Sequence, residues 1–117
     1  MPRNASWNAE ELIIALDLYF RAPPTKSSQN DPRIVEAARL LRRLSGHQRT
    51  AASVYMKMRN FLRFDASSKS KGLARGARLE WAIWKGFHDD RALLRRTAKK
   101  IAARVNALRQ PQESLRL

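Results

Sequence analysis

The chain has 117 residues and no cysteine, so it suits one domain with its own core and excludes both a disulfide framework and a thiolate metal site. No apolar run approaches the roughly 20 residues that a membrane span needs, and the N-terminal segment lacks the apolar core of a signal peptide, so we expect a cytoplasmic protein without a membrane partner. Its 24 lysines and arginines against 10 acids give a net charge of +14 at pH 7, and such a self-repelling domain is expected to bind a polyanion, nucleic acid first, and to be nucleoid-associated.

A first helix is predicted to begin after Asn8, because Asn8 and Glu11 have the spacing of a capping box. Leu12 and Leu16 start an apolar pattern at helical spacing, and the proline pair at residues 23–24 ends the helix. The residues at this spacing are expected to form the buried face of the helix.

The next two helices are joined by a short turn. The Asp-Pro pair at residues 31–32 fits the N-cap and first position of a second helix, and Gly46 fits the left-handed position after its end. A third helix is predicted over residues 50–62. We expect these two helices to form a helix-turn-helix-like pair. The core-facing positions of the third helix are Val54, Met58 and Phe61.

A fourth helix is predicted over residues 77–87. Its apolar positions are Leu79, Ile83, Trp84 and Phe87, and Trp81 lies partly off that face.

A fifth helix is predicted to start after the two aspartates at residues 89–90, which fit an N-cap, and to reach about Leu108. Its apolar residues follow a regular four-three pattern and form a narrow seam. We therefore predict a single all-α domain of about five helices over residues 1–109, with a flexible C-terminal tail over residues 110–117. The seam residues are Leu94, Ala98, Ile101, Val105 and Leu108.

The third helix carries a polar face with residue types that read DNA. In a major groove, lysine and arginine suit guanine and asparagine suits adenine, whereas serine and arginine near the helix start suit phosphate. The alternative is the solvated face of an ordinary core helix. Residues 31–64 have a net charge of +6, which favours nucleic acid. The candidate DNA-binding residues here are Arg49, Ser53, Lys57, Arg59, Asn60 and Arg63.

The segment after the third helix is rich in serine, glycine and cations. Glycines let backbone N–H groups approach an anion, so this loop could wrap a phosphate backbone or enter a minor groove. A flexible connector with ordinary surface charge is the equally weighted alternative. The candidate phosphate-binding residues of the loop are Lys69, Lys71, Arg75 and Arg78.

The fifth helix is the second strongly basic region, because residues 91–117 have a net charge of +7. Its cations could lie along a DNA backbone and release counterions. Its seam could instead pack on a second copy of the chain or on another protein. Packing of the seam inside the domain is the more common outcome for so regular a pattern.

Tryptophan stacking and catalysis have weaker support in the sequence. Trp7, Trp81 and Trp84 could stack on a base, as could Tyr55, although tryptophans in a small domain are more often part of the core. His47 and His88 are far apart in the sequence, and the neighbouring aspartates are better explained as a helix cap. We predict no catalytic residue, metal site or cofactor, and no enzyme activity.

Three segments carry a resemblance to a known family: WNAEELIIALDLYFR (7–21), ASVYMKMRNFLRFD (52–65) and GLARGARLEWAIWKGF (72–87). In order and spacing, over roughly residues 7–105, they resemble the N-terminal accessory region of HNH-type, McrA-like modified-cytosine restriction endonucleases. The resemblance implies an accessory DNA-binding module, one that could sense modified DNA. No segment resembles the HNH nuclease domain, so the resemblance implies no nuclease activity.

These observations predict a non-catalytic protein that binds duplex DNA through the third helix and the loop after it, as a modified-DNA-sensing or regulatory module. The alternative is a phage-type inhibitor or adaptor that binds a nucleic-acid-processing machine. RNA stays open as a ligand because the same cations serve it, although the aromatic sheet motif of RNA-recognition domains is missing.

Overall fold

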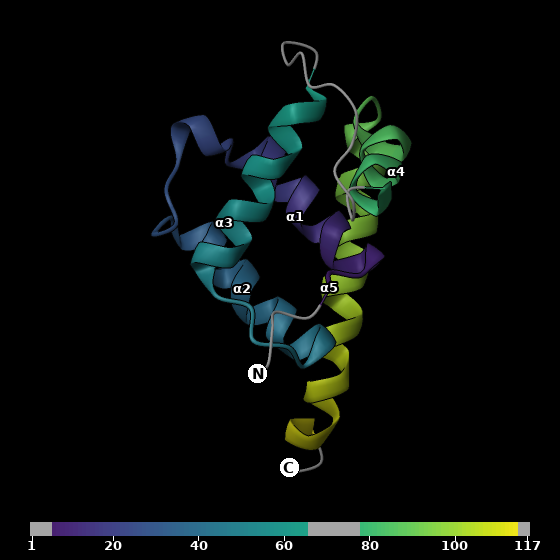
Figure 1. The fold of residues 1–117 in the computed structure, drawn as a ribbon. Coiled ribbons are helices and arrows are strands. Elements are labelled where there is room, and N and C mark those ends of the chain that lie inside the picture. Colours follow the sequence, from purple (N-terminus) through teal and green to yellow (C-terminus); the bar gives the residue numbers. More distant parts are fainter. Residues whose placement is uncertain (1–5, 66–77, 115–117) are drawn as a thin grey trace.

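The computed structural model describes residues 6–65 and 78–114, with side chains up to residue 107, and its regular structure is helical throughout (Figure 1). The predicted all-α class with five α-helices is confirmed, since the described residues contain no strand. The elements are α1 (Ala9–Arg21), η1 (Pro24–Lys26), α2 (Pro32–Ser45), α3 (Ala51–Asn60), η2 (Phe61–Phe64), α4 (Arg78–Phe87) and α5 (Arg91–Ser114), where η marks a short 3-10 helix.

The predicted helix caps of α1 and α2 are present. The backbone N–H of Glu11 donates to Asn8 Oδ1 at 2.8 Å, and the backbone N–H of Asn8 donates to Glu11 Oε1 at 3.1 Å. Asp31 accepts from the backbone of Arg33 at the start of α2. Gly46 has φ 77°, the left-handed conformation that ends α2. These local signals therefore set the start of α1 and both ends of α2.

Helix α1 lies at the centre of the bundle, with α2 and α3 on one side and α4 and α5 on the other (Figure 1). All residues from Glu11 to Tyr19 are buried, because α1 packs against each of the other four α-helices. The single buried face predicted for this helix is therefore too narrow. Its surroundings bury even Glu11 and Asp17, which are 0% and 4% exposed.

An aromatic cluster joins α1, η2 and α4 around Trp84. The Trp84 ring stacks on Phe61 and Phe20, with centroid distances of 6.4 and 5.9 Å, and meets Tyr19 edge-on. The stacking role considered for Trp84 on nucleic acid is ruled out by its burial, since the side chain is 5% exposed. Trp84 is therefore a core residue, which is the more common role of a tryptophan in a small domain.

Helix α5 packs its apolar seam inside the domain. Leu94, Ala98, Ile101 and Val105 are buried, and α5 contacts α1, α2 and α4. The seam up to Val105 is thus covered by this chain and is no dimer surface. No helix in the described ranges has both the length and the apolar content to cross a bilayer.

Two predicted details of α4 and α5 are wrong. Leu79, assigned to the apolar face of α4, is 40% exposed, and Glu80 takes the buried position instead. Helix α5 continues past Leu108 to Ser114, so residues 110–114 of the predicted tail are helical.

Candidate nucleic-acid interface

Arg49, the first candidate DNA-binding residue, is buried in the core. It is 1% exposed, and its guanidinium makes two bonds to Glu11, Nε to Oε2 at 2.7 Å and Nη2 to Oε1 at 2.9 Å. The guanidinium also lies 4.6 Å from the ring centroid of Trp7. The predicted exposure of Arg49 is therefore wrong, and this residue ties α3 to α1.

The Arg49–Glu11 pair keeps a buried carboxylate charged. Burial alone would raise the pKa of Glu11, but hydrogen bonds from Arg49 and from the backbone of Asn8 outweigh it, so the pKa lies below its ordinary value. A buried acid of this kind needs a partner. The sequence held a sign of it, because Glu11 shares a helix face with Ala15 and Leu18, which are both buried.

Lys57 and Arg63 converge on one buried acid, Glu80 of α4. Lys57 Nζ lies 2.6 Å from Glu80 Oε2, and Arg63 Nη2 lies 2.6 Å from Glu80 Oε1. The side chains of Lys57 and Arg63 are only 17% and 30% exposed, so most of their surface is covered. The expectation that Lys57 and Arg63 lie on an open, DNA-reading face of α3 is therefore wrong, because Glu80 of α4 covers them.

The remaining predicted residues of α3 have different surroundings. Ser53 is half-buried and forms a capping box with Thr50, in which each side chain accepts from the other backbone N–H. Asn60 is half-buried, whereas Arg59 is exposed. Tyr55 donates its hydroxyl to the carbonyl of Pro24 at 2.9 Å, so it holds η1. Arg59 is thus the predicted cation of α3 that faces solvent.

Helix α4 presents a row of two cations and a tryptophan, which we call the α4 stripe: Arg78, Trp81 and Lys85. All three are exposed, and Trp81 is 38% exposed. Lys85 Nζ lies 5.8 Å from the centroid of the Trp81 ring, and the Phe64 ring packs against Trp81 in a tilted arrangement with a centroid distance of 5.2 Å. Arg78 and Trp81 were among the predicted candidates. Lys85 was missed, although its spacing of seven from Arg78 puts it on the same face.

The outward face of α5 carries a second row of cations, Arg96 and Lys100. Both are exposed, and neither has an acid partner among the described residues. Like charges four residues apart weaken a helix slightly, so this pair does not serve the stability of α5. The other flanks of α5 are paired, since Arg95 bonds Asp17 and Arg104 bonds Glu10.

The acids of the described residues are almost all engaged inside the fold. Six of them form ion pairs, Asp65 accepts from the Tyr19 hydroxyl, and Asp90 caps α5 through the backbone of Leu93. Little negative charge is left to offset the exposed cations. The six paired acids are Glu10, Glu11, Asp17, Asp31, Glu36 and Glu80.

Three predicted phosphate-binding residues, Lys69, Lys71 and Arg75, lie outside the described residues. The described part of the chain holds no group of three histidine, cysteine, aspartate or glutamate side chains that could bind a metal ion. His88 stacks on Trp84 with a centroid distance of 5.1 Å, and Asp90 caps α5 by accepting from the backbone N–H of Leu93. His88 and Asp90 therefore have local structural roles.

No protein-family model, curated protein or solved structure matches the chain. The resemblance to the accessory region of McrA-like endonucleases therefore stays a prediction from the residues quoted above. The site is defined by its own geometry.

Proposed function

We propose that this protein binds duplex DNA without catalysis, through the α4 stripe, Arg59 at the end of α3, and the outward cations of α5. The observation that carries the proposal is that, among the described residues, most acids are paired within the fold and several exposed cations are not. Most acids are engaged in the fold, whereas five exposed cations of these three helices have no acid partner within the described ranges: Arg59, Arg78, Lys85, Arg96 and Lys100. A polyanion would supply the missing countercharge.

The chemistry of the α4 stripe supports nucleic acid over a generic polyanion. Trp81 lies between two cations in the row, so one helix face offers both phosphate partners and a flat apolar surface. An aromatic ring with flanking cations suits a sugar, a base edge or a flipped base. Duplex is the form we propose, because the roughly 12 Å wide major groove admits an exposed helix face.

The test is fluorescence anisotropy with a labelled 20-base-pair duplex at increasing salt, beside matched single-stranded DNA, RNA and methylated duplex. Binding through several phosphates predicts a steep loss of affinity between about 50 and 200 mM salt. The methylated duplex tests the modified-DNA role that the resemblance implies.

The deciding variant is Lys85→Ala, with Lys26→Ala as its matched control. Both lysines are exposed, and η1 lies on the other side of α3 from α4 (Figure 1). We expect Lys85→Ala to weaken duplex binding by several-fold and Lys26→Ala to change it little. Equal effects of the two variants, or no duplex binding at low salt, would overturn the proposal.

A further inference from the structure

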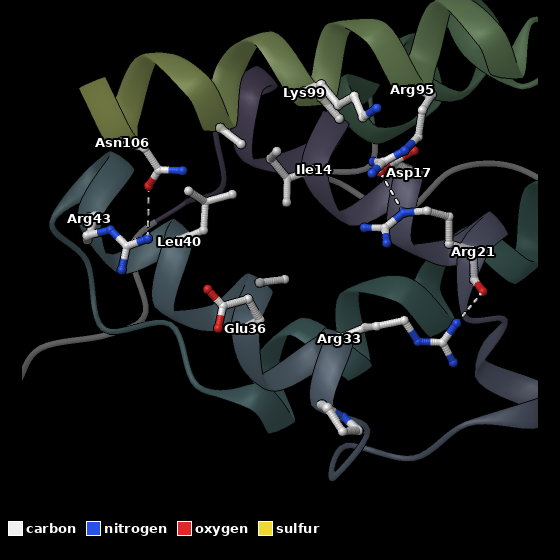
Figure 2. A pocket seen from close by; sticks show the side chains of 14 residues that line it. Ile14, Asp17, Arg21, Arg33, Glu36, Leu40, Arg43, Arg95, Lys99 and Asn106 are labelled. Atoms are coloured by element: carbon white, nitrogen blue, oxygen red, sulfur yellow. Dashed lines mark hydrogen bonds and ion pairs between the residues drawn. The ribbon is translucent and has the colours of Figure 1, made fainter. Parts of the chain in front are cut away.

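A groove lies between α1, α2 and α5, away from the α4 stripe, with a volume of about 430 Å³ (Figure 2). Its floor is aliphatic. Ile14 of α1 and Leu40 of α2 form part of this floor, between the helix axes of α2 and α5. Ala37, Ala98 and Ala102 complete the floor, and their small side chains keep the groove open. An aliphatic floor of this kind accepts apolar side chains.

The edge of this groove is strongly cationic. Arg21 and Arg95 converge on Asp17, with Arg21 Nε 2.9 Å and Arg95 Nη1 2.5 Å from the same carboxylate oxygen, Oδ2. One acid therefore holds two arginines at the edge and neutralises only one of them. The cations of the edge are Arg21, Arg33, Arg43, Arg95 and Lys99.

Two of these cations have no acid partner in the described part of the chain. Arg43 reaches only the side-chain oxygen of Asn106, at 3.4 Å, and Lys99 forms no hydrogen bond or ion pair there. The second acid of the groove, Glu36, is paired with Arg39 at 3.5 Å and is 65% exposed. The groove thus combines an apolar floor with a net positive edge.

We propose that this groove binds an acidic amphipathic segment of a partner protein. The partner would place one row of apolar side chains on the aliphatic floor and its carboxylates against the arginines and Lys99. This inference goes beyond DNA binding, since it concerns a different face and a different class of ligand.

The size of the groove fits such a segment. Arg33 and Arg43 mark its length along α2, which corresponds to about 15 Å at 1.5 Å per residue. A volume near 430 Å³ over that length leaves room for one row of side chains, but not for a whole helix of about 10 Å diameter. An amphipathic helix would therefore lie on the groove and insert its apolar ridge.

The floor argues against nucleic acid as the occupant. Among the described lining residues there is no aromatic ring for a base to stack on. Asp17 and Glu36 line the groove and would repel a continuous phosphate chain more than a peptide that can choose where its charges lie. Charge complementarity together with an apolar floor therefore favours an acidic peptide.

Adjacent residues of α5 provide matched controls. Lys99 lines the groove, whereas Lys100 is exposed on the outward face that we assign to DNA. Ala102 lines the groove, whereas Ala103 is exposed and does not. Each pair gives the same substitution one residue apart, so a general effect of the changed charge or of helix propensity affects both members alike.

The probe is a 14-residue helical peptide with leucines at positions spaced three and four apart and glutamates on both flanks. Two control peptides carry lysine for every glutamate, or glutamine for every leucine. We expect saturable binding of the first peptide to the full chain by anisotropy, and none of either control. Equal binding of the leucine-free acidic peptide would reduce the effect to charge attraction and overturn the proposal.

The variants locate the site. Lys99→Glu is expected to weaken peptide binding about fivefold and Lys100→Glu less than about twofold. Ala102→Trp fills the groove and should abolish binding, whereas Ala103→Trp should leave it intact, with circular dichroism confirming helix content. If Ala102→Trp does not fold, the lysine pair still decides. Equal effects of Lys99→Glu and Lys100→Glu on the peptide would overturn the proposal, whatever the two variants do to DNA.

Discussion

Arg49 and Glu11, separated by 38 positions in the sequence, form a buried bidentate ion pair that fastens the start of α3 to the first turn of α1. Glu11 has a double role, because its carboxylate also accepts from the backbone of Asn8 in the capping box of α1. The same carboxylate therefore orders a helix terminus and a tertiary contact. A residue that looks like a DNA contact in the sequence is part of the fold.

Arg49→Met is expected to destabilise the protein by about 3–5 kcal/mol, because it leaves Glu11 buried without its charge partner. Urea denaturation followed by circular dichroism measures the loss. The control is Arg39→Met, which breaks the exposed pair with Glu36 and should cost less than about 0.5 kcal/mol. Similar losses of unfolding free energy in the two variants would contradict the prediction that the buried Arg49–Glu11 pair stabilises the fold more than the exposed Arg39–Glu36 pair.

Stability is expected to fall as the pH drops from about 5 toward 3. The folded state holds the pKa of Glu11 below its ordinary value, so this group stabilises the fold above its unfolded pKa and loses that contribution as it is protonated in the native state. Glu10, bonded to Arg104, acts in the same direction. Urea midpoints measured across this range should change less with pH in Glu11→Gln, although that variant is less stable at neutral pH.

A wild-type midpoint that is independent of pH between 5 and 3 would contradict the assigned role of these carboxylates. An unchanged pH dependence in Glu11→Gln would assign the effect to other acids, since Asp31 also has a lowered pKa through its bonds with Arg33.

Local signals in the sequence predict the helices well, because caps, prolines and apolar spacing act within a few residues. The cap at Asn8, the left-handed Gly46 and the buried α5 residues from Leu94 to Val105 are present as predicted, and the side chain of Leu108 lies outside the described residues. The site was harder to predict, because its ion pairs join distant segments. Helical spacing places Lys57 on a polar face but cannot show that Glu80, 23 positions away, covers it.

Glu80 therefore controls how many cations are available to a ligand. Glu80→Gln removes the charge that holds Lys57 and Arg63, and we expect it to strengthen duplex DNA binding about two- to fivefold at low salt. Glu36→Gln is the matched control, because it removes the same charge from an exposed site on α2. Anisotropy titrations of both variants, after a check of their melting temperatures, test the effect. An equal gain in Glu36→Gln would assign it to net charge alone.

The tryptophans of α4 separate stability from binding. Trp84 packs in the aromatic cluster, so Trp84→Ala should cost about 3–5 kcal/mol of unfolding free energy. Trp81 is 38% exposed on the α4 stripe, so Trp81→Ala should cost much less stability and weaken DNA binding by about 1–3 kcal/mol, the range for aromatic contacts to bases. Urea denaturation and anisotropy on both variants give the two quantities. A Trp81→Ala variant with normal DNA affinity would place the contact surface away from α4, because no other aromatic side chain belongs to the stripe.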